Sequence, residues 1–293
     1  MKISLPLFII AFIIVILLST VFLYNVYIKN LVPGTPKILW LYWDSEELPH
    51  TIQLIKNHNE KTIKGWDIRY LNNKTIDDYI PRSAYHKNYN ALVPQNQSDW
   101  IRLYIVYNYG GCWLDMGIII NDSKALNKIY EKSLKTGSEM TVFKTVKKNG
   151  YFTHESGKKL PLVVDSWFIC APKKSGVIKN WLQEFTNAMD EGFLNYKRRV
   201  ISEGVDISKI HFANEEDTYL MVHICIQYLL QKKRLPKVTF LDSGKSMLKL
   251  QNICKWDNRC LADKLNNDPE SKELPFIKLT GYNRKENIDR FFE

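Results

Sequence analysis

The chain has 293 residues, of which 45% are hydrophobic and 13% aromatic, and its 41 basic side chains outnumber 31 acidic ones. This composition can fill a sizeable core and excludes an intrinsically disordered chain. The net charge of +10 favours anionic partners, but the basic residues form scattered short clusters without a zinc-finger, basic-zipper or RNP motif, which argues against nucleic acid as a partner.

An uncharged apolar stretch, Ile3 to Ile28, opens the sequence. A helix needs about 20 apolar residues to cross the hydrocarbon core of a bilayer, so residues 1–30 predict an N-terminal transmembrane signal anchor. The stretch is longer than the core of a cleaved signal peptide, and no small-residue cleavage site follows it. We expect a single-pass type II membrane protein, with its domain in the Golgi or ER lumen if the source is eukaryotic.

Residues 31–36 predict a short stem, and residues 37–293 predict one folded domain in which strands and helices alternate. Apolar runs predict strands at 37–43, 66–71, 112–120, 141–144 and 162–170. Helical patterns cover 50–60, 94–109, 176–190 and 215–233. The last helix is expected to start at Asn214 as cap, with Glu215, Glu216 and Asp217 in its first turn. This alternation predicts an α/β domain with a mostly parallel central sheet.

The segment from Gln97 to Asn121 combines a helix, a glycine pair and a strand. Asp99 and Arg102 are three residues apart and share a helix face. The turn at Gly110-Gly111 then leads through a strand to Asp115, and ligands of open α/β sheets bind at the carboxyl ends of strands. In isolation, these residues also fit a purely structural interpretation. In that interpretation, Asp99 and Arg102 form an ion pair on the helix surface and Asp115 caps a turn.

The string SDWIRLYIVYNYGGCWLD, residues 98–115, resembles the signature of the glycosyltransferase family with a DXD-containing sugar-binding region. It resembles even more closely the capsular polysaccharide synthesis family, to which PKILWLYWDS and VVDSWFICAPKKSGVIKNWLQEF are also similar. The resemblance implies a GT-A-type nucleotide-sugar-binding fold. It also implies retaining transfer of a sugar from a UDP- or GDP-linked donor to a glycan or lipid-linked acceptor, usually with Mn²⁺ or Mg²⁺.

By motif position, the resemblance gives catalytic roles to Asp99, Arg102 and Asp115, with Asp115 as the acid linked to the metal. Asp99 would bind ribose or the donor sugar, and Arg102 would contact the donor sugar or the diphosphate. Trp43 would stack on the base. The expected donor-binding residues are Tyr42, Trp43, Asp99, Arg102, Gly110, Gly111 and Trp113.

The sequence departs from the DXD pattern at Gly117, which stands where the second acid is expected. Asp122 lies too far along the predicted strand to replace that acid. Asp165, on another predicted strand, is a candidate to take its place. The alternative is therefore a catalytically inactive sugar-nucleotide or polysaccharide-binding protein of the same fold; a membrane-anchored adaptor with a basic binding surface is a third reading. Asp217 and His223, on the last predicted helix, are candidates to reach the cleft, although a helix cap and a core histidine are the favoured interpretations.

Five cysteines are present, and none belongs to a CxxC pair, which argues against a structural zinc site. Cys254 and Cys260 lie close together in a loop-like stretch, where a disulfide and two free thiols are both compatible with the sequence. Cys112, Cys170 and Cys225 have apolar neighbours and are expected to be buried.

Overall fold

The computed structural model describes residues 14, 17–20, 34–145, 151–153, 156–157, 159–161 and 163–293. The chain divides into two compact units, Met1–Gly34 and Thr35–Glu293. The second unit contains the sheets, the helices and the candidate site described below.

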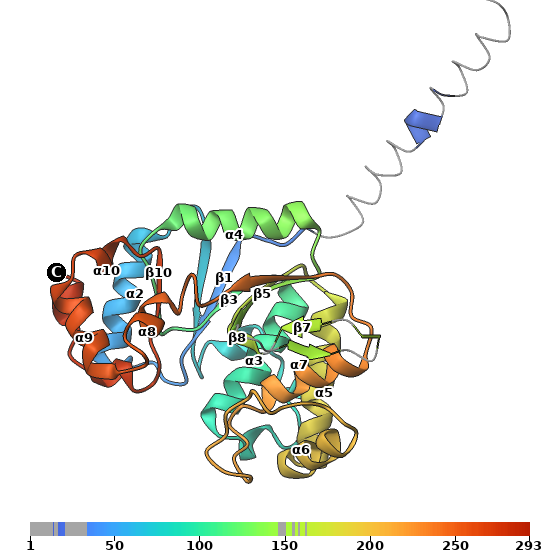
Figure 1. The fold of residues 1–293 in the computed structure, drawn as a ribbon. Coiled ribbons are helices and arrows are strands. Elements are labelled where there is room, and N and C mark those ends of the chain that lie inside the picture. Colours follow the sequence, from blue (N-terminus) through green and yellow to red (C-terminus); the bar gives the residue numbers. More distant parts are fainter. Residues whose placement is uncertain are drawn as a thin grey trace, which may run out of the picture. The chain divides into compact units, whose positions relative to one another are not determined.

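A six-stranded sheet forms the centre of this unit, with the strand order β2-β1-β3-β8-β5-β9 (Figure 1). Its strands are β1 (Ile38–Tyr42), β2 (Asp67–Leu71), β3 (Gly111–Leu114), β5 (Met140–Thr145), β8 (Val163–Ala171) and β9 (Val238–Asp242). β1 pairs in parallel with β2 and β3, and β5 with β9, whereas β8 is antiparallel to both of its neighbours. The predicted α/β class with a mostly parallel sheet is confirmed.

Two smaller strand pairs accompany the sheet: β4 (Ile118–Ile120) with β10 (Phe276–Lys278), and β6 (Tyr151–Thr153) with β7 (Lys159–Pro161). The helices are α2 (His50–Thr62), α3 (Pro94–Tyr109), α4 (Ser123–Thr136), α5 (Gly176–Glu191), α6 (Phe193–Ser202), α7 (Met221–Lys232), α8 (Lys249–Ile253), α9 (Asn258–Asn267) and α10 (Glu270–Glu273). Short 3₁₀ turns are η1 (Ile76–Asp78), η2 (Arg82–Ala84), η3 (Tyr89–Ala91), η4 (Asn283–Lys285) and η5 (Asp289–Phe291).

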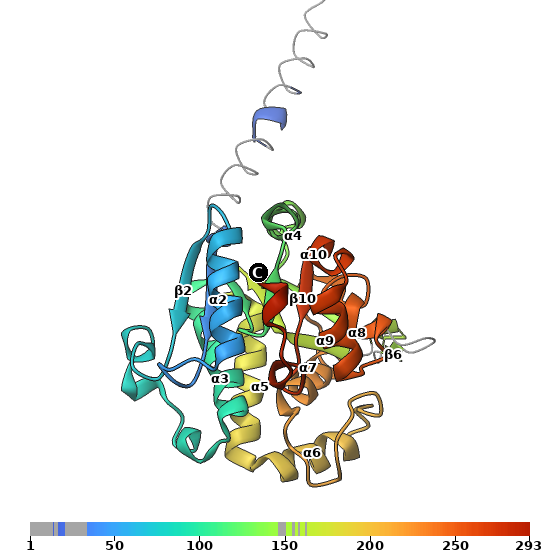
Figure 2. The same cartoon turned by 90° about the vertical axis from the view of Figure 1, so that its left-hand side faces the viewer.

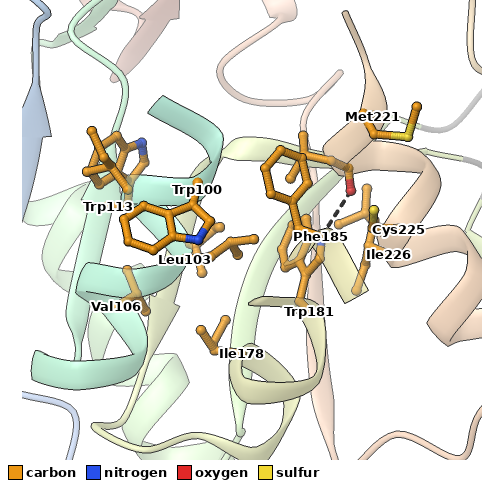
Figure 3. Packing of buried hydrophobic residues seen from close by; sticks show 14 of the residues in the cluster. Trp100, Leu103, Val106, Trp113, Ile178, Trp181, Phe185, Met221, Cys225 and Ile226 are labelled. Atoms are coloured by element: carbon orange, nitrogen blue, oxygen red, sulfur yellow. Dashed lines mark hydrogen bonds between the residues drawn. The ribbon is translucent and has the colours of Figure 1, made fainter. Parts of the chain in front are cut away.

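Alternate side chains of each central strand enter two separate cores, because neighbouring residues of a strand point to opposite faces of the sheet. In β1, Trp40 and Tyr42 join the core under α3, α5 and α7, whereas Leu39 and Leu41 join the core under α2 and α4. Figure 3 shows the first core, where the indole of Trp181 donates a 2.9 Å hydrogen bond to the carbonyl of Val222. Figure 2 shows the C-terminal helices α8–α10 beside α2, on the side of the second core.

The turn between α3 and β3 depends on two glycines with positive φ, 71° at Gly110 and 96° at Gly111. A Cβ at Gly110 would lie 2.6 Å from the backbone nitrogen of Lys173, and one at Gly111 would lie 2.8 Å from the carbonyl oxygen of Ile38. The indole of Trp40 donates a buried 2.8 Å hydrogen bond to the carbonyl of Gly110. No larger side chain fits at Gly110 or Gly111. The tight turn places β3 directly beside β1.

The predicted fold class is wrong in one element, the transmembrane helix. Within the part of the chain that the structure describes, no helix is both long and apolar enough to cross a bilayer. Of the predicted anchor, only Ile14 and Leu17–Thr20 are described, and the rest of residues 1–30 lies outside the described residues.

Two predicted elements have other bounds. The strand expected at 112–120 is split by a turn after β3, where the amide of Ile118 donates to the carbonyl of Asp115, and β4 then joins a different sheet. The helix expected from residue 215 begins at Met221. The ammonium of Lys197 binds the carbonyls of Glu215 and Asp217, and the Asp217 carboxylate accepts from the amides of Ala213 and Tyr219, so the expected first turn is a loop.

Two disulfides lie in this unit. Cys112 and Cys170 stand opposite each other in β3 and β8 and are joined, and Cys254 is joined to Cys260. Cys225 is a buried free thiol. The sequence had left the second pair open and gave no sign of the first, because strand register brings those cysteines together.

We expect Gly111→Ala to reduce the free energy of unfolding by about 3 kcal/mol or more, since the new methyl group meets a backbone oxygen at a positive φ. Gly137→Ala is the matched control, because Gly137 also has a positive φ but has open space around it, and should cost about 1 kcal/mol. Urea denaturation of both variants measures the difference. Equal losses would contradict the steric account of the α3–β3 turn.

Candidate active site

A cavity of about 410 Å³ opens where β1 and β3 end and the antiparallel β8 begins. We call it the strand-end cavity. Its wall comes from α3, from the residues after β1 and β3, from β8, from the start of α7 and from the segment after β10. Residues far apart in the sequence thus meet at the edge of the sheet where ligands of open α/β folds bind.

Asp115 follows β3 directly, and its side chain enters the strand-end cavity. One carboxylate oxygen accepts from the indole of Trp113 at 3.1 Å and lies 3.4 Å from Arg102. The other oxygen lies 3.1 Å from the ammonium of Lys278. Burial alone would raise the pKa of Asp115, but Lys278 and Arg102 outweigh it and lower the pKa to about 2. Asp115 is therefore ionised at neutral pH.

Arg102 joins the helix α3 to the end of β3. Its guanidinium lies 3.2 Å from Asp99 and 3.4 Å from Asp115, and it donates a 2.7 Å hydrogen bond to the hydroxyl of Ser166. The side chains of Asp99 and Arg102 are only 8% and 7% exposed. The reading as a surface ion pair is therefore wrong, since the pair lies in the wall of the cavity.

Asp99 has a different charge state from Asp115. Burial, and to a smaller extent the charge of Asp115, raises the pKa of Asp99 to about 7, although Arg102 acts in the opposite direction. In the cavity, Asp115 is thus ionised at neutral pH, whereas Asp99 exchanges a proton near neutral pH. Such separated pKa values are typical of functional sites.

The end of β10 and the segment after it close the cavity with two cations that the sequence did not predict, Lys278 and Arg284. Arg284 lies over the ring of Trp43, with 5.2 Å from the guanidinium carbon to the ring centroid. Asn283 holds the turn between them, because its side-chain oxygen Oδ1 accepts from the amide and the hydroxyl of Thr280 at 2.8 Å each. Their signal in the sequence is FIKLTGYN, residues 276–283, where a lysine at a strand end comes just before a Thr-Gly turn.

His223, interpreted as a core histidine, instead lines the cavity from the first turn of α7. Its Nδ1 is buried and has no hydrogen-bond partner among the described residues. Burial, with a contribution from Arg102, lowers the pKa of His223 to about 4. The imidazole is therefore neutral at physiological pH and retains an unused polar atom.

The structure brings together most of the predicted site residues but not all of them. Besides Asp99, Arg102 and Asp115, both Tyr42 and Trp43 line the cavity. Gly110 and Gly111 do not line it and act through the α3–β3 turn. Trp113 does not line it either: it is 1% exposed and supports Asp115 from behind.

The remaining aspartates differ in whether they line the strand-end cavity. Asp165 is buried on β8 and accepts from the hydroxyl of Thr145, outside the cavity. Asp122 caps α4. Asp44 lies in the loop after β1 and lines the cavity. No group of three or more His, Cys, Asp and Glu side chains within the described ranges is arranged to hold a metal ion.

Comparison with known sequences identifies one family. The sequence profile described as capsular polysaccharide synthesis protein matches residues 23–246, which confirms the resemblance seen in the sequence. No curated protein matches the chain.

Three similar solved structures have low sequence identity and low TM-scores. PaToxG glycosyltransferase is 14% identical, with 94% of this chain and 92% of that chain covered and a TM-score of 0.38. A glycosyltransferase involved in the glycosylation of the major capsid of PBCV-1 is 12% identical, with 87% and 100% covered and a TM-score of 0.39. The catalytic domain of alpha-toxin from Clostridium novyi is 9% identical, with 68% and 70% covered and a TM-score of 0.31. At these scores the likeness decides nothing about activity.

Asp99→Asn should remove one contribution to the pH dependence of stability. With a pKa near 7, folded Asp99 holds a proton that the unfolded chain, with an aspartate pKa of about 3.9, has already released. This group alone makes the free energy of unfolding fall as pH rises through that window, by roughly 2–4 kcal/mol. The lowered pKa of His223 contributes in the opposite direction, so the contribution of Asp99 is measured as the difference between wild type and Asp99→Asn in chemical denaturation at pH 4.5 to 8. The same pH dependence in both proteins would contradict the assignment.

Proposed function

This chain belongs to the capsular polysaccharide synthesis protein family, and we propose that it is a glycosyltransferase that uses a nucleotide-sugar donor. The donor is UDP- or GDP-linked, and the acceptor is a glycan or a glycolipid. The observation that carries the proposal is the strand-end cavity, which gathers Asp99, Arg102 and Asp115 with an aromatic wall and two further cations. This is the set of groups that a nucleoside diphosphate sugar requires.

The aromatic wall suits the base of the donor. Trp43 and Tyr42 follow one another at the end of β1, and both line the cavity. A base that stacks on Trp43 would place its diphosphate toward Arg102 and the segment after β10, which lines the same cavity. Asp99 then contacts ribose or sugar hydroxyls, as its motif position implies, and Asp115 holds Lys278 and Arg102 beside the diphosphate.

The reaction forms a bond between the acceptor oxygen and the anomeric carbon and breaks the bond from that carbon to the diphosphate. The acceptor proton passes to the departing diphosphate, whose developing charge is stabilised by fixed cations in the cavity. We propose that the acceptor enters on the face that the diphosphate leaves, with retention of configuration, as the family resemblance implies. We propose that the neutral imidazole of His223, which lines the same cavity, contacts the acceptor.

One observation favours the alternative of an inactive binding protein of the same fold, namely the glycine at position 117 in place of the second acid. The two candidates differ in turnover and not in donor binding. Incubation of the purified chain with UDP- and GDP-sugars distinguishes them, with the release of free sugar as the measured quantity. The glycosyltransferase hydrolyses the donor, whereas the inactive binding protein does not.

Asp115→Asn should lower donor hydrolysis and transfer by about 100-fold or more, since the neutral amide no longer holds Lys278 and Arg102 in place. Asp165→Asn is the matched control, because Asp165 is another buried acid near the sheet edge but does not line the cavity. It should retain activity within a few-fold. A fall of the same size in both variants, at equal thermal stability, would contradict the role of Asp115.

Trp43→Ala should weaken binding of the preferred nucleoside diphosphate by roughly 10-fold or more, because stacking on an aromatic ring contributes about 1–3 kcal/mol per base. Trp43→Phe keeps a ring and should retain most of the affinity. Titration calorimetry with UDP and with GDP measures both variants. Unchanged affinity in Trp43→Ala would place the base elsewhere.

A further inference from the structure

We propose that Arg284, Lys278 and Arg102 bind the diphosphate of the donor in place of a divalent metal, so that donor binding and transfer need no metal ion. This inference rests on the proposed function. It starts from a disagreement between the residues of the strand-end cavity and the Mn²⁺ or Mg²⁺ that the family resemblance implies.

Position 117 has neither an acid nor the space for one. A Cβ at Gly117 would lie 2.9 Å from the carbonyl oxygen of Leu279 and 3.2 Å from a guanidinium nitrogen of Arg284. The backbone there is fixed, since the amide of Leu279 donates a 2.7 Å hydrogen bond to the carbonyl of Gly117. The place where the second acid would begin is thus occupied by the main chain and by a cation.

The remaining acid of the motif has cations on both carboxylate oxygens. Lys278 lies 3.1 Å from one oxygen of Asp115, and Arg102 lies 3.4 Å from the other. A divalent ion binds carboxylate oxygens at about 2.1 Å for Mg²⁺, which would bring it against these fixed positive charges. The residues present therefore do not fit the expected metal.

Arg284 is the cation with unused binding capacity. Its guanidinium makes no ion pair or hydrogen bond with any residue in the described ranges, although it is half-buried and lines the cavity. Burial lowers the pKa of Arg284 and that of Lys278, so both cations gain from an anion at short range. A guanidinium offers five N–H donors and binds phosphate in a bidentate manner.

The cations are held by a rigid segment. Lys278 pairs with Ile118 in the β4–β10 ladder, and its amide donates a 2.9 Å hydrogen bond to the carbonyl of Met247. Asn283, which precedes Arg284, is buried, and its side-chain oxygen Oδ1 accepts a 2.6 Å hydrogen bond from the side-chain amide of Gln251. Cations that are fixed in position before the reaction stabilise the charge of the departing diphosphate without reorganisation. A bound metal would supply the same electrostatic stabilisation.

The test uses the full chain and measures binding of UDP, GDP and inorganic pyrophosphate by calorimetry in EDTA and in millimolar Mn²⁺. We expect the bound nucleotide to have the same Kd in both conditions, within about three-fold. Donor hydrolysis should also continue in EDTA. Binding that appears only with Mn²⁺ would overturn this inference and leave the proposed function intact. Absence of binding in both conditions would contradict the proposed function as well.

Arg284→Gln should weaken binding of the nucleoside diphosphate in EDTA by roughly 10- to 100-fold, as expected for loss of a charged hydrogen-bond donor. Binding of the corresponding nucleoside, which lacks phosphate, should change little, and Arg284→Lys should restore part of the loss. Arg290→Gln is the matched control, because Arg290 is an exposed arginine nearby that donates to Asn267. Equal affinities of Arg284→Gln and wild type would overturn the inference.

Discussion

The ion pairs of Arg102 with Asp99 and Asp115 are the interaction on which the candidate site depends, because they join the helix α3 to the end of β3 inside the protein. A buried ion pair adds little to stability, since desolvation offsets most of the Coulomb attraction. It does, however, fix geometry, because a buried charge without its partner is costly. Lys278 adds a second positive charge on Asp115, so three separate elements converge on one carboxylate.

This convergence needs the glycine turn. Asp99, Arg102 and Asp115 lie on both sides of Gly110-Gly111, and a longer turn would move β3 away from α3. The close approach of the turn to Lys173 and Ile38 shows why both positions are glycine. The turn and the ion pairs therefore form one unit, in which backbone geometry sets the distance and charge holds the side chains.

Local signals explain which parts of this unit could be predicted. Helix α3 begins at Pro94 and ends before Gly110, and both are boundary residues with a physical reason. The apolar run after Gly111 also predicted a strand, but its periodicity could not show that the chain turns at Asp115 and enters another sheet at Ile118. Lys278, 163 residues from Asp115, reaches the cavity only through that second sheet, so no local pattern could have found it.

The second sheet also gives Gly117 a physical meaning. The segment after β10 packs on the turn that follows Asp115, and the carbonyl oxygen of Leu279 and the side chain of Arg284 occupy the space beside Gly117. An acidic side chain at position 117 and Arg284 cannot both fit there. Glycine leaves room for the guanidinium, so a positive charge stands where the family motif has a negative one. On the proposed arrangement, the missing acid does not mark a lost site. It marks a site in which positive charge comes from the fold itself, and the family motif alone could not reveal this because the compensating residue lies beyond the matched segment, which ends at residue 246.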